Sequence, residues 1–174
     1  GVQTMMKSGI GFYAVRAGEV MVGAVVAVNA LGDVFDMETG RQIAGMLTAE
    51  GNGFAESEKA LFRTCAERAD NLFTGNTTIG AVVTNACFDK SRQKKIASMA
   101  HNGLARTIRP VHTSADGDSI YALSTGNLRA NLDAVGTLAA HVMGKAVNRA
   151  VLAARGMAGY PAACDLAFLS GQTA

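Results

Sequence analysis

Cysteine is scarce in this sequence, and the three cysteines are not spaced as metal ligands or disulfide partners would be. Cys65, Cys87 and Cys164 form no CxxC pair and have no histidine at a metal-binding spacing. We therefore expect neither a disulfide framework nor a zinc site. Reduced thiols of this kind are typical of a cytoplasmic protein.

Charge is also sparse, and neither sign dominates. Charged residues make up 17% of the 174 residues, and the formal net charge is +2. The one basic cluster, Arg92, Lys94 and Lys95, falls within an expected helix, where we interpret it as a solvated face. The sequence therefore predicts no nucleic-acid partner and no membrane-surface partner.

Long hydrophobic runs are missing too. No apolar stretch is long enough to span a bilayer without interruption by glycine or a polar residue, and no signal-peptide pattern is visible. The sequence is nevertheless 49% hydrophobic and contains 20 glycines, a composition typical of a compact protein with a buried sheet. We expect residues 1–174 to form a single domain.

Hydrophobic patterns predict alternating strands and helices. Residues 6–36 are typical of two strands separated by glycine, and the β-branched run 20–30 indicates a strand buried on both faces. Further elements are expected in this order: a loop-rich segment 40–76 with a short helix over 55–69, a strand over 77–85, a helix over 90–108 that Pro110 stops, a strand over 119–124, and a long helix over 128–154 with a stripe of small residues.

This order favours an α/β fold in which helices cover a sheet that packs on a second sheet. A four-layer α/β/β/α sandwich is the predicted architecture. The expected strands are too few to complete both sheets, so we expect part of the N-terminal portion of such a fold to be missing from this sequence.

Thr77 is the residue best placed for chemistry. It opens a strand directly after Gly75-Asn76, and its hydroxyl could attack the preceding carbonyl in an N-to-O acyl shift. Cleavage would leave Thr77 with a free amine, whose pKa of about 7.7–8.0 suits a general base for the hydroxyl. The alternative is that Thr77 and Thr78 are simply β-forming residues that open a strand.

The sequence resembles the DmpA/NylC type of self-processing N-terminal-nucleophile hydrolases. This group contains L-aminopeptidase/D-esterases, β-aminopeptidases and nylon-oligomer endohydrolases. The resemblance lies in Gly75-Asn76-Thr77-Thr78-Ile79, in Asp116-Gly117-Asp118 and in further stretches that occur in the family's order, at residues 7–11, 22–24, 28–33, 81–86, 99–106, 108–110 and 119–126. It therefore covers most of the chain.

The resemblance implies cleavage between Asn76 and Thr77. Residues 1–76 would then correspond to the end of an α-subunit and residues 77–174 to a β-subunit. It further implies an aminopeptidase that acts on short peptides or amino-acid amides without metal or organic cofactor. Cleaved αβ units would assemble into a homo-oligomer. A hydrolase of linear amide oligomers, an acyl transferase similar to ornithine acetyltransferase and a non-catalytic relative are the alternatives.

Four further site residues follow from the resemblance. The amide of Asn29 would help to stabilise the oxyanion, although an Asn that ends a strand is also typical of a turn. Asp116 and Asp118, two apart on the turn entering a strand, would share one face and hold the Thr77 amine. The alternative interpretation is that Asp116 and Asp118 belong to a solvated Asp-Gly-Asp turn without a catalytic role. Lys7 resembles a lysine near the site in the nylon-hydrolase branch.

The histidines fit a structural role better than a catalytic triad. His101 lies on the expected helix 90–108, where we interpret it as a structural hydrogen-bonding residue, and no GxSxG motif supports a Ser/His/Asp triad. Arg109 and His112 are expected to brace the turn before Asp116.

Overall fold

A four-stranded sheet forms the body of the protein. The computed structural model describes residues 4–67 and 75–170. Strands β1 (Ile10–Ala17) and β2 (Val20–Ala27) form an antiparallel hairpin, which turns at Gly18 with a φ of 62° that favours glycine. Strand β5 (Ile79–Ala86) pairs antiparallel with β2, and β7 (Ser119–Leu128) pairs parallel with β5. The strand order is therefore β1-β2-β5-β7.

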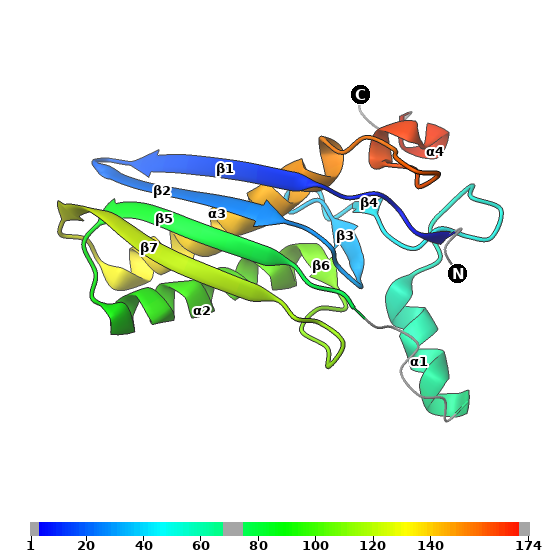
Figure 1. The fold of residues 1–174 in the computed structure, drawn as a ribbon, viewed down its shortest axis with the longest axis horizontal. Helices are drawn as coiled ribbons and strands as arrows, with labels where there is room; N and C mark the ends of the chain where they lie inside the picture. The colour runs from blue at the N-terminus through cyan, green and yellow to red at the C-terminus, as the bar shows by residue number, and fades with distance from the viewer. Residues whose placement is uncertain (1–3, 68–74, 171–174) are drawn as a thin grey trace.

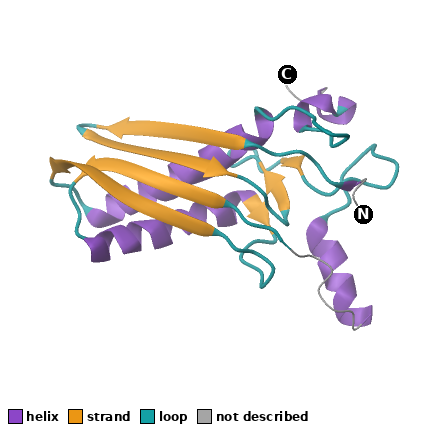
Figure 2. Cartoon of the chain, viewed as in Figure 1, coloured by secondary structure: helices purple, strands orange, loops and turns teal. Residues whose placement is uncertain are grey.

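Two long helices cover one face of this sheet (Figures 1 and 2). Helix α2 (Lys90–Thr107) begins at Asp89, whose carboxylate accepts from the Arg92 N–H. Helix α3 (Leu132–Leu152) begins at Asn131, which accepts from the Ala134 N–H in the same way. Each cap satisfies a backbone donor that the helix leaves unpaired, which explains why the helices begin at these residues.

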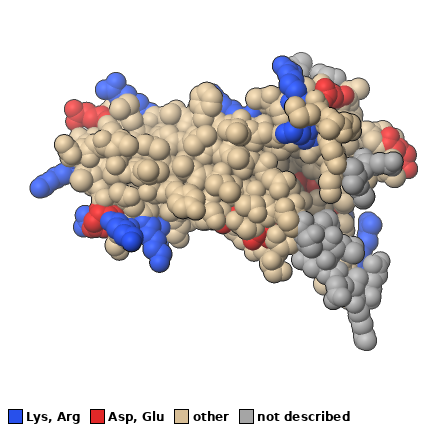
Figure 3. All heavy atoms as spheres, in the orientation of Figure 1, with Lys and Arg blue, Asp and Glu red and all other residues tan. Residues whose placement is uncertain are grey.

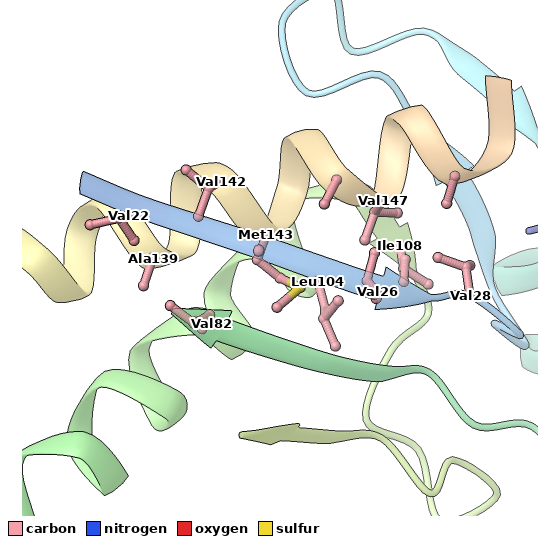
Figure 4. Close-up of a cluster of buried hydrophobic side chains, with 14 of the residues drawn as sticks. Val22, Val26, Val28, Val82, Leu104, Ile108, Ala139, Val142, Met143 and Val147 are labelled. Atoms are coloured by element: carbon pink, nitrogen blue, oxygen red, sulfur yellow. The ribbon is translucent and has the colours of Figure 1, made fainter. Parts of the chain in front are cut away.

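The hydrophobic core lies between the sheet and the helices. Val22 and Val26 of β2, Val82 of β5, Leu104 of α2 and Met143 of α3 are each at most 1% exposed. Figure 4 shows these side chains converging between the strands of the sheet and the two helices. Burial of large aliphatic side chains on this scale stabilises the domain by roughly 1.5–3 kcal/mol for each side chain.

Glycine allows the two helices to approach closely. A Cβ added to Gly103 of α2 would meet the Ala140 carbonyl oxygen of α3 and lie 2.8 Å from the Gly144 nitrogen. The expected stripe of small residues on the last helix thus packs on α2 at Ala140 and Gly144, and on Gly11 of β1 at Ala146 and Ala150.

A smaller sheet lies beside the N-terminal end of β5. It consists of β3 (Asp33–Phe35), β4 (Gln42–Ala44) and β6 (Ile108–Arg109), in the order β4-β3-β6. Helix α1 (Ser57–Glu67) projects from the body, as Figure 1 shows. The chain then ends in the short helices η2 (Ala163–Asp165) and α4 (Ala167–Ser170).

The face of the large sheet that the helices leave uncovered is apolar. Figure 3 shows that most of this face carries no charged side chain. Its exposed residues include Ile10, Phe12, Met21, Val25, Ile79, Val83, Tyr121 and Leu123. The prediction that residues 20–30 are buried on both faces is therefore wrong for the described chain, because helices cover only one face of β2.

The other predicted elements are largely confirmed. The helices expected over 55–69, 90–108 and 128–154 are α1, α2 and α3, and the expected strands are present. The long helix begins four residues later than predicted because β7 continues to Leu128. The short strands β3, β4 and β6 were not predicted as separate elements. No helix in the described ranges is long and apolar enough to cross a membrane.

We expect Gly103→Ala to lower the free energy of unfolding by about 1–3 kcal/mol, because its Cβ would overpack the α2–α3 contact. Gly53→Ala is the matched control, since its Cβ would make only ordinary contact with the Thr48 side chain at 3.8 Å. This control should change stability by less than about 0.5 kcal/mol. Urea denaturation of the full-length protein measures both values. Equal unfolding midpoints for the two variants would contradict the close helix contact.

Candidate active site

The Asn76–Thr77 peptide lies where the chain enters β5, beside the turn that enters β7. The parallel register of the two strands pairs Ile79 with Ser119. It continues backwards as an isolated bridge between Asn76 and Asp116. In Figure 1 the loop before β7 lies next to the start of β5. The strand register thus places residues 76–78 alongside residues 116–118.

Main-chain hydrogen bonds fix this peptide on both sides. The Gly117 N–H donates to the Asn76 carbonyl oxygen at 2.9 Å, and the Thr77 N–H donates to the Asn29 carbonyl oxygen at 3.0 Å. The Thr77 hydroxyl itself donates to the Asn76 carbonyl oxygen at 2.6 Å. The hydroxyl therefore lies against the carbonyl group that it would attack, and a backbone donor already contacts the oxygen of that group.

Gly117 contacts the candidate site, although the sequence did not single it out. A Cβ at this position would lie 2.7 Å from the Thr77 Oγ1, closer than real side chains approach. Glycine therefore allows the backbone of the turn to contact both the Thr77 hydroxyl and the Asn76 carbonyl. The sequence signal was the glycine between Asp116 and Asp118, but its role depends on the strand register.

The two predicted carboxylates take different positions. Asp118 Oδ1 accepts from the Thr78 N–H at 2.8 Å, which places this side chain directly beside the residue that follows Thr77. Asp116 Oδ2 instead accepts from the Thr113 N–H and the Thr113 hydroxyl at 2.8 and 2.9 Å. Asp116 thus closes its own turn and reaches the site through its backbone pairing with Asn76.

Two histidines adjoin Asp118. The Nδ1 atom of His112 lies 3.3 Å from Asp118 Oδ2, and the His101 ring packs edge-on against His112 with centroids 4.9 Å apart. Burial lowers the pKa of His101, and the neighbouring His112 lowers it further, against the opposing effect of Asp118. Arg109 lies elsewhere, with its guanidinium 4.4 Å from the centre of the Phe35 ring.

Asn29 contacts the site mainly through its backbone. Its carbonyl oxygen accepts the Thr77 N–H, the group that cleavage would convert into the free amine. Its side-chain amide donates to the Gly75 carbonyl oxygen at 3.3 Å, one residue before the peptide carbonyl of Asn76. The amide is therefore next to the expected oxyanion position, and its proposed role as an oxyanion donor stays a prediction.

A cavity of about 690 Å³ opens beside Asn76. Its walls come from residues 4–8, 28–32 and 44–46, from helix α1, and from Val151 of α3. Lys7 is the one charged side chain among the described residues that line it, and its ammonium group donates to the Ser8 carbonyl oxygen. Lys7 thus shares the cavity with Asn29 and Asn76, and no described hydrogen bond joins it to Thr77.

A buried carboxyl group holds one wall of this cavity. Asp33, which is 3% exposed, accepts from the Met46 N–H at 3.0 Å, the Ser57 N–H at 2.7 Å and the Ser57 hydroxyl at 2.7 Å. These bonds tie β3 to the loop and helix that form the far wall. In the described part of the chain, no three His, Cys, Asp or Glu side chains gather as a metal site would require.

The fold is that of the N-terminal-nucleophile hydrolases. The structure resembles the L-aminopeptidase D-Ala-esterase/amidase of Ochrobactrum anthropi, described as a variant of that fold, with a TM-score of 0.54 and 21% sequence identity over 90% of this chain and 43% of the other. This likeness confirms the predicted fold class. The described residues form one helix layer and one sheet of such a four-layer sandwich.

The chain belongs to peptidase family S58, whose sequence pattern it matches over residues 2–163. It is 38% identical over 160 residues to an uncharacterized aminopeptidase of Mycobacterium leprae, covering 83% of this chain and 44% of the relative. It is 31% identical over 146 residues to the 6-aminohexanoate-oligomer endohydrolase of an Agromyces species, covering 76% of this chain and 41% of the relative. The chain thus spans less than half the length of these relatives, and the resemblance inferred from the sequence is confirmed.

We expect Asp33→Ala to lower the free energy of unfolding by roughly 2–4 kcal/mol, because it leaves buried donors on residues 46 and 57 without their acceptor. Asp36→Ala is the control: Asp36 also accepts three hydrogen bonds, from Glu38 and Thr39, but in an exposed turn. Its loss should cost about 1 kcal/mol or less. Urea denaturation compares the two. A cost for Asp33→Ala no greater than that of the control would contradict its role in the cavity wall.

Proposed function

We propose that this protein is an amide hydrolase that activates itself by cleavage between Asn76 and Thr77. The observation that carries the proposal is the 2.6 Å hydrogen bond between the Thr77 hydroxyl and the Asn76 carbonyl oxygen. Membership of peptidase family S58 supports the hydrolase class. The proposed mechanism uses only side chains and backbone groups of the protein, without metal or organic cofactor.

Self-cleavage begins with attack of Thr77 Oγ1 on the Asn76 carbonyl carbon. As the C–O bond forms, negative charge develops on the carbonyl oxygen, where the Gly117 N–H already donates at 2.9 Å. The C–N bond then breaks, and the hydroxyl proton passes to the departing Thr77 nitrogen. Water opens the resulting ester, which leaves a carboxylate on Asn76 and restores the Thr77 hydroxyl beside a free amine.

The freed Thr77 is then the nucleophile for substrate amides. Its amine accepts the hydroxyl proton while Oγ1 attacks the substrate carbonyl, and the substrate amine leaves with that proton. Water releases the acyl group from Thr77. The Asn29 carbonyl oxygen, which accepts the Thr77 N–H at 3.0 Å before cleavage, holds the new amine in place. Asp118 lies one residue away and favours the protonated amine electrostatically.

The leading substrate class is short peptides and amino-acid amides. The names of relatives that share 38% and 34% identity with the chain, all uncharacterized aminopeptidases, support it. Linear amide oligomers are the second candidate. They are favoured by the endohydrolase relatives and by the cavity itself, in which Lys7 is the only charge among the described lining residues. We further propose that the cleaved units assemble into a homo-oligomer and that the protein is cytoplasmic.

We expect the full-length protein to yield a fragment that begins at Thr77, detected by intact-mass measurement under denaturing conditions. Thr77→Ala should remain whole because it lacks the hydroxyl, whereas Thr77→Ser should still be cleaved because it keeps a nucleophile. A wild-type chain that stays whole at neutral pH, or a Thr77→Ala chain that is cleaved, would overturn the self-activating mechanism.

The cleaved protein then separates the substrate classes. Release of free amino acid from amino-acid amides supports aminopeptidase action, and shortening of 6-aminohexanoate oligomers supports the second class. Transfer of acetyl from acetylornithine to glutamate would support the acyl-transferase alternative instead. Absence of all three activities in a cleaved wild-type protein would favour a non-catalytic relative.

We expect Gly117→Ala to slow self-cleavage by at least about 10-fold. The added Cβ would lie 2.7 Å from Thr77 Oγ1, so either the hydroxyl or the turn must move. Movement of the hydroxyl takes the nucleophile from the Asn76 carbonyl, and movement of the turn displaces the backbone N–H of residue 117 from the carbonyl oxygen. Loss of such a donor costs about 100-fold or more in other enzymes. The rate of fragment appearance measures the effect. Gly53→Ala, remote from the site, should cleave at the wild-type rate. Unchanged cleavage of Gly117→Ala would contradict the role of this close approach.

A further inference from the structure

His112 lies at the end of a chain of contacts that leads to the cleavage point. Its Nδ1 atom is 3.3 Å from Asp118 Oδ2. The other oxygen of that carboxylate, Oδ1, accepts from the Thr78 N–H at 2.8 Å. The Asp118 carboxylate therefore links the His112 imidazole to the peptide group between Thr77 and Thr78.

We propose that His112 is a positioning residue for self-cleavage, which acts by holding the Asp118 carboxylate against the Thr78 amide. The proposal rests on the proposed self-processing at Asn76–Thr77. Thr77 has a peptide plane on each side. The plane before it is held by Gly117 and Asn29, and the plane after it is held by Asp118. Rotation of either plane moves the Thr77 side chain relative to the Asn76 carbonyl carbon.

The burial of Asp118 explains why it needs His112. Its side chain is only 5% exposed, and a carboxylate removed from water is costly unless both oxygens have partners. The Thr78 N–H satisfies Oδ1, and the imidazole Nδ1 faces Oδ2. Without His112, Asp118 would turn towards solvent or recruit water, and the Thr78 N–H would lose a fixed acceptor.

The imidazole is in turn oriented by its surroundings. The His101 ring of α2 packs edge-on against it at 4.9 Å, with an interplanar angle of 63°. Burial and the neighbouring His112 lower the pKa of His101, and it is the Nδ1 atom of His112 that lies within 3.3 Å of Asp118 Oδ2. The contacts on either side thus direct Nδ1 of His112 towards the carboxylate.

The backbone conformation at His112 decides which substitutions are matched. Its φ is 58°, in the left-handed region that few residues other than glycine adopt, asparagine, aspartate and histidine being the most frequent of them. Glycine and asparagine accept this conformation most readily. They therefore remove or replace the imidazole without adding backbone strain, which makes them matched substitutions at this position.

The test compares His112→Gly with His112→Asn in the full-length protein. The Asn amide nitrogen lies close to the position of the imidazole Nδ1 and can donate to Asp118, whereas glycine leaves no donor. We expect fragment formation to slow by about 10-fold or more in His112→Gly, because the buried Asp118 carboxylate loses the polar partner of one oxygen. His112→Asn should cleave within about 3-fold of the wild-type rate, since its amide nitrogen can still face that oxygen. Wild-type cleavage in the glycine variant, or equal slowing in both variants, would overturn the proposal.

A second measurement tests whether His112 holds Asp118 against the Thr78 amide in a protein that cannot cleave itself. In a Thr77→Ala background, hydrogen exchange of the Thr78 amide should speed up by about 10-fold or more with His112→Gly and recover with His112→Asn. The Val82 amide in the middle of β5 should not change, which separates positioning from general unfolding. If the wild-type chain is never cleaved, the proposed self-processing fails, while this exchange still decides whether His112 holds Asp118. Unchanged Thr78 exchange in His112→Gly would overturn the inference.

Discussion

The parallel pairing of β5 with β7 is the constraint on which the rest of the site depends. It aligns Ile79 with Ser119 and extends to a bridge between Asn76 and Asp116, so that the turn into β7 runs beside the proposed cleavage point. A shift of one residue would exchange the two faces of the strand. It would also move the Gly117 N–H away from the Asn76 carbonyl. The chemistry of this site is therefore a consequence of strand register as much as of residue identity.

The helices keep that register fixed. Val82, in the middle of β5, is 1% exposed and packs with Leu104 and Met143 of the two covering helices. Because a Cβ at Gly80 would lie 2.8 Å from the Met143 Cε, a strand slipped by one residue would force a larger side chain against α3. The close contact of α2 and α3 at Gly103 lets the two helices together cover the apolar face of the sheet. The packing far from Thr77 thus stabilises the hydrogen bonds around it.

The sequence was most informative where the pattern is local. Periodic apolar residues predicted α2 and α3, whereas the position of Thr77 after a loop only allowed a nucleophile, a role that the resemblance favoured and that stays a prediction. The resemblance added Asn29, Asp116 and Asp118. The different positions of the two carboxylates could not be predicted. Asp116 lies before the first residue of β7, so strand alternation does not set the direction of its side chain, which accepts hydrogen bonds from Thr113. Short acidic side chains often form such local hydrogen bonds with the backbone. The contact of His112 with Asp118 depends on how α2 and the loop after it meet β7, so no spacing in the sequence predicts it.

The incorrect prediction for residues 20–30 has the same origin. Residues 20–30 are apolar on both faces of β2. On the uncovered face, Val25 belongs to an exposed apolar surface that includes Ile79 and Val83 of the neighbouring strand β5. Composition alone cannot say what covers such a surface. In a four-layer sandwich the face opposite the helices is the one that meets the second sheet, with inner-face side chains of both sheets interdigitating. The apolar character of this face matches the fold class even though the described residues leave it open. Strand β5 thus joins the two features, since its buried face fixes the register and the proposed cleavage point lies just before its first residue.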